Sequence, residues 1–308
     1  MLSRMSGYQS EAAVRMRRLA ALPFEPTSGV PSGRSKVWWP IRSILSHREL
    51  LGLLIRRDLK ARYKDSALGF FWSLAKPLLQ LAIYFVVMGH FLQAAKGIPD
   101  FAIYVFAGLT AMGLFTETVT GGTGSILSNA GLVKKVQLPR EVFPLASVGG
   151  GLFNFGVQVL VLILATIVAG HPPLHPEVFY VLPALAILVI YATAAALLFS
   201  AINEYLRDMK YLVEVGTMLL FWASPVVYSW TMVKSIITSP LVLDIYTNNP
   251  LTLAVLGFQK AFWVSAPDSA FPSDLLLRMA LALAVGVVAL FLSHRVFLRL
   301  QGNFAQEL

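Results

Sequence analysis

The sequence predicts an all-α polytopic membrane protein, and three observations lead to this fold class. Of the 308 residues, 56% are hydrophobic and only 13% are charged, whereas a soluble domain carries about 25% charged residues. Several uncharged stretches reach about 20 residues, the length at which a helix crosses a bilayer. The net charge of +9 is concentrated near the N-terminus and in short connections. This composition excludes a soluble globular enzyme and a disordered chain, and the absence of cysteine excludes a disulfide-stabilised domain.

The N-terminal part carries most of the excess charge. Residues 1–66 contain thirteen basic and five acidic side chains, a net charge of +8. Residues 1–46 contain several prolines but no apolar run of signal-peptide length. We therefore expect a flexible basic cytoplasmic tail over residues 1–46 rather than a cleaved signal.

Residues 47–65, HRELLGLLIRRDLKARYKD, have the pattern of an amphipathic helix. At about 100° per residue, the basic side chains gather on one arc and most leucines on the other. Such a helix suits the cytoplasmic interface, where its basic face meets anionic headgroups. The alternative is a solvated anchor with no further role.

Six spans are expected within a membrane domain covering residues 66–302. They are 77–95, 101–116, 142–170, 178–203, 215–233 and 279–293. With the N-terminus inside, the cytoplasmic segments hold 20 basic residues, and the opposite side holds only Lys96, Lys234 and Lys260. The positive-inside rule then places both termini, including residues 303–308, in the cytoplasm, and the protein in the cell membrane as a multi-pass protein.

Three stretches are not simple spans. Residues 125–135, SILSNAGLVKK, follow an expected bend at Gly121, Gly122 and Gly124, and predict a short cytoplasmic helix that docks on a partner or merely connects two spans. Residues 204–214 form the second cytoplasmic connection, with charges that can pair locally. Residues 231–274 are apolar but interrupted by prolines, which favours re-entrant helices on the outer side.

Aromatic side chains are frequent in the first and fifth spans. One interpretation is the belt of Trp and Tyr at the membrane interface, together with ordinary packing. The other is an aromatic-lined path for a sugar chain, because sugar C–H groups stack on aromatic faces. Phe221 and Trp222 lie near the middle of their span, where a belt explains them less well.

The sequence does not contain the motifs of catalysis. It lacks a G-x-x-x-x-G-K-[ST] loop, and its five histidines do not have metal-ligand spacing with cysteine or paired carboxylates. We therefore expect no catalytic residue, metal site or cofactor in this chain.

Residues 53–79, LLIRRDLKARYKDSALGFFWSLAKPLL, resemble the N-terminal pattern of ABC-2 type transporter permeases, in particular the group that exports O-antigen, teichoic acid, galactan-type and related lipid-linked glycans. The matching positions are Arg62, Tyr63, Ser66, Leu68, Gly69, Trp72, Pro77, Leu78 and Leu79. Weaker matches are residues 129–135 (NAGLVKK), Arg207-Asp208, Asn249-Pro250-Leu251 and Phe304-Ala305. Lys76 departs from the pattern; because a charge is costly at mid-bilayer, it should face a water-filled path or the interface.

The resemblance implies a half-transporter that forms a homodimer and pairs with two separate ABC nucleotide-binding subunits, which bind ATP and Mg. Nucleic acid is not an implied partner; membrane lipids and a lipid-linked polysaccharide are. The helix over residues 47–65 would be an interface or gate helix, and residues 231–274 would supply re-entrant helices at the outer gate. The implied substrate path and gate comprise Arg62, Tyr63, Phe71, Trp72, Lys76, Tyr84, Phe221, Trp222 and Tyr228. The implied ATPase-coupling residues are Ser128, Asn129, Leu132, Lys134, Lys135, Arg207 and Asp208.

The leading hypothesis is thus the permease of a lipid-linked polysaccharide exporter, driven by ATP hydrolysis in a separate subunit. A drug or lipid exporter of the same fold is one alternative. A membrane-bound glycosyltransferase is a second, but it needs paired carboxylates on the outer side, and Asp244, Asp268 and Asp274 stand apart in the sequence.

Overall fold

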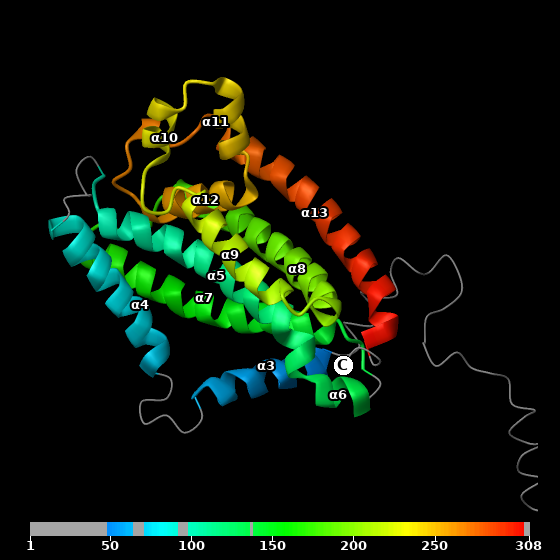
Figure 1. Cartoon of the computed structure of the whole chain (residues 1–308). Helices are drawn as coiled ribbons and strands as arrows, with labels where there is room; N and C mark the ends of the chain where they lie inside the picture. Colours follow the sequence, from blue (N-terminus) through cyan, green and yellow to red (C-terminus); the bar gives the residue numbers. More distant parts are fainter. Residues whose placement is uncertain (1–47, 64–70, 92–97, 136–137, 305–308) are drawn as a thin grey trace, which may run out of the picture. The chain divides into compact units, whose positions relative to one another are not determined.

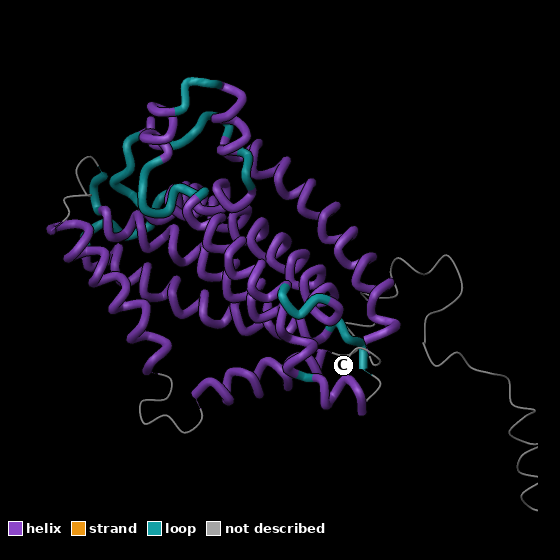
Figure 2. Tube along the Cα trace, viewed as in Figure 1, coloured by secondary structure: helices purple, strands orange, loops and turns teal. Residues whose placement is uncertain are grey.

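The computed structural model describes residues 48–63, 71–91, 98–135 and 138–304. These residues form helices joined by turns and loops, and no strand occurs among them (Figure 2). The predicted tail over residues 1–46 lies outside the described residues, as do residues 305–308. The helices, labelled as in Figure 1, are α3 (Arg48–Tyr63), α4 (Phe71–Ile83), α5 (Phe101–Ser128), α6 (Ala130–Lys135), α7 (Val142–Val168), α8 (Val181–Tyr205), α9 (Met209–Trp222), α10 (Trp230–Ile236), α11 (Pro240–Thr247), α12 (Pro250–Phe262) and α13 (Leu275–Leu300).

Four helical segments in the described part are long and apolar enough to cross a membrane. They are Phe101–Ser128, Val142–Val168, Pro176–Tyr205 and Leu275–Leu300. The third of these includes a 3-10 turn, Pro176–Tyr180, that leads directly into α8. The predicted all-α polytopic membrane class is therefore confirmed. The first predicted span, residues 77–95, falls on α4 continued by π-helical turns over Tyr84–Phe91, and its residues 92–95 lie outside the described part.

The predicted bend at Gly121, Gly122 and Gly124 is wrong, because α5 continues through all three glycines to Ser128. A Cβ atom on Gly122 would lie 2.5 Å from the Cβ of Ala196 in α8, so this glycine permits close helix packing. Hydroxyl groups along α5 donate to carbonyls one turn earlier, for example Thr123 to Val119 at 2.7 Å. Polar residues that suggested a turn thus belong to a continuous, largely buried helix.

The predicted fifth span, residues 215–233, is not one helix. The helix α9 ends at Trp222, irregular backbone follows, and α10 begins at Trp230. Pro225 lies within this break and cannot donate a helical hydrogen bond. Residues 223–229 therefore place non-helical backbone inside an apolar stretch, and its polar groups need partners elsewhere in the protein.

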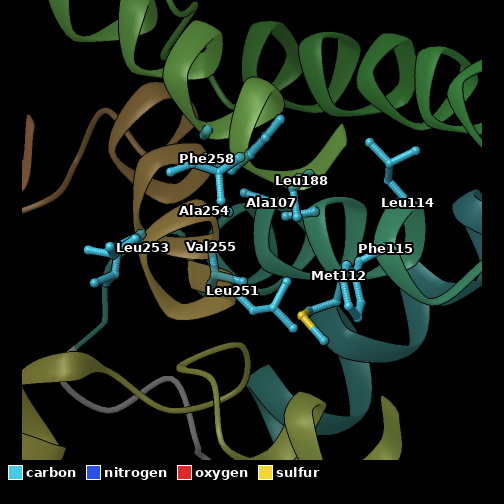
Figure 3. Packing of buried hydrophobic residues seen from close by; sticks show 14 of the residues in the cluster. Ala107, Met112, Leu114, Phe115, Leu188, Leu251, Leu253, Ala254, Val255 and Phe258 are labelled. Atoms are coloured by element: carbon cyan, nitrogen blue, oxygen red, sulfur yellow. The ribbon is translucent and has the colours of Figure 1, made fainter. Parts of the chain in front are cut away.

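The main hydrophobic core lies between α5, α8 and α12. Figure 3 shows Met112 of α5 and Leu188 of α8 near Leu251, Val255 and Phe258 of α12. Every residue of α12 from Leu251 to Gln259 is buried. This 13-residue helix is too short to span a bilayer, but it is surrounded by protein, which is the setting that a re-entrant helix requires.

A second hydrophobic cluster, called here the end cluster, lies at the opposite end of the bundle from α10 and α11 (Figure 1). It joins α3, α5, α6, α7, α8 and α13 through side chains far apart in the sequence. Its buried members are Leu54, Ile126, Val133, Val142, Phe143, Ala146, Leu197, Ala201, Phe297 and Phe304. The short helices α3 and α6 are therefore both packed into this cluster.

Candidate functional site

The aromatic residues predicted for a substrate path lie mainly on the helices that the bundle covers least. Only Val213 and Thr217 are buried among the fourteen residues of α9, and several large apolar side chains of α4 are exposed. Trp72 of α4 is 44% exposed and Trp222 of α9 is 56% exposed. Neither tryptophan is therefore buried in the core of this chain, and each can contact lipid, a second subunit or a substrate.

Three of the predicted path residues come together at the end of α9. The rings of Phe221 and Trp222 meet edge to face, with their centroids 5.5 Å apart. The Tyr228 hydroxyl donates to the Trp222 carbonyl at 2.6 Å. Tyr84 instead packs against the aromatic cluster that contains Tyr104 and Trp263. The side chains of Arg62, Tyr63, Phe71 and Lys76 lie outside the described part of the structure.

Two residues that the sequence reasoning missed, Tyr104 and Gln259, bind the broken backbone between α9 and α10. The Tyr104 hydroxyl lies 2.9 Å from the Pro225 carbonyl oxygen and 2.7 Å from that of Tyr228. The Gln259 amide donates to the same Pro225 oxygen at 2.7 Å. Both side chains are buried. A polar side chain that follows a long apolar run, as Gln259 follows residues 253–258 in α12, is the signal that would have identified this site.

The predicted ATPase-coupling segment lies at the other end of the bundle. Val133 of α6 is buried in the end cluster, whereas Leu132 and Lys134 beside it are exposed. One face of α6 is thus anchored and the other is free to meet a partner. Ser128 is exposed, and the side chain of Lys135 lies outside the described part. Arg207 and Asp208, in the connection between α8 and α9, are also exposed.

The helix α3 is attached to both α6 and α7. An Arg57 guanidinium nitrogen donates to the Asn129 side-chain oxygen, just before α6, at 2.8 Å and also pairs with Asp58 at 2.7 Å. Ile55 packs on Gly149 of α7, where a Cβ atom would lie only 2.3 Å from the Ile55 side chain. Arg57 was not predicted as a site residue, because its partner is 72 positions away in the sequence.

A cavity of about 730 Å³ lies between α4, α5 and α7. Its lining is mostly aliphatic and aromatic, including Leu81, Phe101 and Val161, and also includes Asp100. Trp72 and Trp222 do not line it. Such walls fit hydrocarbon better than the hydroxyl groups of a sugar chain, because a buried hydroxyl without a hydrogen-bond partner is costly.

The long apolar helices define a polytopic helical membrane protein. It combines weakly covered aromatic helices, a broken helix held by buried donors, and a half-exposed short helix at one end. Among the described residues, no group of three or more His, Cys, Asp or Glu side chains is placed to hold a metal ion.

Comparison with known proteins identifies the family. Residues 49–263 match the ABC-2 type transporter family, and the chain belongs to it. It is 30% identical over 269 residues to an O-antigen export system permease protein of Myxococcus xanthus. The aligned region covers 87% of this chain and 98% of that relative. A protein of the same name from Klebsiella pneumoniae is 29% identical over 261 residues, 84% of this chain and 95% of the relative. A capsule polysaccharide export inner-membrane protein of Neisseria meningitidis is 20% identical over 166 residues, 53% and 61% of the two chains. The resemblance found from residues 53–79 is thereby confirmed.

Proposed function

We propose that this chain is the transmembrane subunit of an ABC exporter that moves a lipid-linked polysaccharide across the cytoplasmic membrane. The observation that carries the proposal is the similarity to O-antigen export permeases over nearly their whole length. A drug or lipid exporter would share the fold, but the names of the relatives favour a glycan. For a glycosyltransferase, the outer carboxylates are less suitable, since Asp244 pairs with Arg278 at 3.0 Å rather than with a second acid.

The proposed topology has six membrane-crossing segments with both termini in the cytoplasm. Four are the long apolar helices. The other two would be α4 with its π-helical turns, and α9 together with the non-helical residues 223–229 that follow it. The helices α10, α11 and α12 would form the re-entrant outer segment. The excess of Lys and Arg in the segments at the α3 and α6 end supports this orientation.

The proposed path for the polysaccharide runs between two copies of the chain, along α4 and α9. Both helices present apolar and aromatic side chains that their own chain leaves uncovered. A homodimer would cover part of this surface and leave aromatic faces along the passage. The α3 helix would then serve as the gate at the cytoplasmic interface, with its basic face toward a phosphate-bearing headgroup.

The proposed ATPase-docking surface consists of the exposed face of α6 with Arg207 and Asp208. ATP and Mg would be bound by the partner subunit. Charge reversal by Lys134→Glu with Lys135→Glu should weaken co-purification of the ATPase about tenfold or more, because like charges opposed across an interface cost several kcal/mol. Lys234→Glu, an exposed lysine on α10, is the matched control. Unchanged co-purification of the double variant would remove the coupling role of α6.

The chain purified without its partner should not hydrolyse ATP. The physical reason is that the sequence has no P-loop to hold the nucleotide phosphates. Phosphate release is measured on the chain alone, on the ATPase alone and on the complex, with a series of lipid-linked glycans added. Hydrolysis by the isolated chain would contradict the half-transporter assignment, and stimulation by one glycan class would identify the substrate.

A further inference from the structure

The last described residues of the chain are packed into the end cluster. After α13, a 3-10 turn over Gln301–Asn303 leads to Phe304, whose side chain is fully buried. Its ring meets the Phe297 ring edge to face at 5.7 Å between centroids, and the Tyr205 ring at 6.3 Å. Phe297 belongs to α13 and Tyr205 is the last residue of α8. The C-terminal segment is therefore part of the hydrophobic core at this end.

Polar contacts hold the same segment from two further directions. Arg140, just before α7, donates to the Gln301 carbonyl oxygen, and its guanidinium carbon lies 5.5 Å from the centre of the Phe304 ring. Burial lowers the pKa of Arg140, but a guanidinium remains protonated in proteins and keeps this cation–π contact. The Tyr205 hydroxyl donates to the Leu300 carbonyl oxygen at 2.8 Å.

These contacts lie next to both parts of the proposed ATPase-docking surface, α6 and the connection between α8 and α9. Arg140 follows α6 along the chain, and Tyr205 directly precedes the connection that holds Arg207 and Asp208. The two connections are distant in sequence, and residues 300–304 touch the chain next to each of them. Val133 of α6 lies in the same hydrophobic cluster as Phe304.

We propose that Phe304 and Arg140 are positioning residues, which join the two ATPase-facing connections into one unit. A push from the ATPase on α6 would then reach α7, α8 and α13 together rather than displace α6 alone. This inference rests on the proposed function of the two connections. It assigns to the C-terminal residues a role in energy coupling, without contact with ATP or with the polysaccharide.

The test uses the full complex of this chain and its ATPase, reconstituted in liposomes. Phe304→Ala and Arg140→Gln are compared with Phe291→Ala and Arg295→Gln, because Arg295 lies 5.6 Å over the ring of Phe291 on the same helix, where both side chains are exposed. The amount of glycan exported per ATP hydrolysed should fall at least about fivefold in the first pair. Co-purification and basal ATP hydrolysis should persist in all four variants, and Phe304→Leu should restore part of the export.

Hydrogen exchange of the α6 and α8–α9 backbone amides is measured on the same complexes without substrate. We expect faster exchange in Phe304→Ala and in Arg140→Gln, and wild-type exchange in the control variants Phe291→Ala and Arg295→Gln. Wild-type exchange together with wild-type export per ATP overturns the proposal, as does an equal loss in the control pair. If Phe304→Ala does not assemble, Arg140→Gln and Tyr205→Phe decide, since they leave the core volume nearly intact. Failure of the wild-type complex to export any glycan would instead refute the proposed function, while the exchange data still report on this contact.

Discussion

Replacing both Trp72 and Trp222 with alanine is expected to reduce polysaccharide export by about 5- to 150-fold, with the protein still folded and still bound to its ATPase. Each aromatic contact is worth about 0.5–1.5 kcal/mol, and each 1.36 kcal/mol changes a rate tenfold. Both indoles are about half exposed in this chain and neither belongs to the buried core, so their removal should leave the fold intact. Export is measured in cells that synthesise the glycan and in reconstituted liposomes.

The matched control for the two tryptophans is Phe291→Ala on α13, a side chain that is 44% exposed, as Trp72 is. An aromatic side chain of the same exposure on a helix outside the proposed path should leave export unchanged. If the tryptophan double variant exports as well as wild type, the aromatic path along α4 and α9 is rejected. If Phe291→Ala is equally impaired, the effect reflects general loss of membrane anchoring rather than a path.

Removing both donors to the break between α9 and α10 is expected to destabilise the protein by more than the two single changes added together. In Tyr104→Phe, the Pro225 carbonyl keeps its bond from Gln259, and in Gln259→Leu it keeps the Tyr104 hydroxyl. The double variant leaves the carbonyls of Pro225 and Tyr228 without these donors. A buried unpaired polar group costs about 1–3 kcal/mol, so the double variant should lose roughly 2–6 kcal/mol of unfolding free energy.

A double-mutant cycle of thermal or denaturant unfolding in detergent measures this coupling. Tyr191→Phe is the matched control, because the Tyr191 hydroxyl donates at 3.0 Å to Ala282, whose carbonyl lies within the continuous helix α13. That variant should change the unfolding free energy by about 1 kcal/mol or less. Strictly additive single changes would show that the break between α9 and α10 does not depend on its shared donors.

The membrane class and four of the expected spans could be predicted from local composition. Uncharged runs such as residues 142–170 and 178–203 match α7 and α8 closely, because the preference of apolar side chains for lipid acts over about 20 consecutive residues. The amphipathic pattern of residues 47–65 likewise predicted a helix, and α3 occupies that stretch. These features depend on neighbours in sequence, which the pattern displays directly.

The glycine-rich part of α5 shows where local pattern is insufficient. Gly121, Gly122 and Gly124 have the composition of a bend, yet they lie in a continuous helix. The deciding contact is with Ala196, more than seventy positions further along the chain. The prediction of the fifth span was wrong for the opposite reason. Residues 215–233 are uncharged and largely apolar, but Pro225 interrupts the helix, and buried donors satisfy the carbonyl groups that are left without helical partners.

Some residues of the candidate site could be recognised in the sequence, and others only in the structure. The family pattern in residues 53–79 and the lysines of α6 were visible in the sequence. Tyr104, Gln259, Arg57 and Arg140 were not, since each acts through a partner between 34 and 161 positions away. A single hydrogen-bonding side chain has no periodicity by which it can be recognised.

The sequence by itself determined that this is a membrane protein, that its positive charge is concentrated in the N-terminal part and in short connections, and that it belongs with ABC-2 type permeases. Each of these follows from the solvation of local segments or from residues close together in the chain. Only the tertiary structure decided that α9 stops at Trp222, that α12 is enclosed by protein, and that Phe304 packs into the same cluster as Val133 of α6. Those outcomes depend on which distant groups can satisfy a carbonyl or fill a gap, and that is settled only when the helices pack.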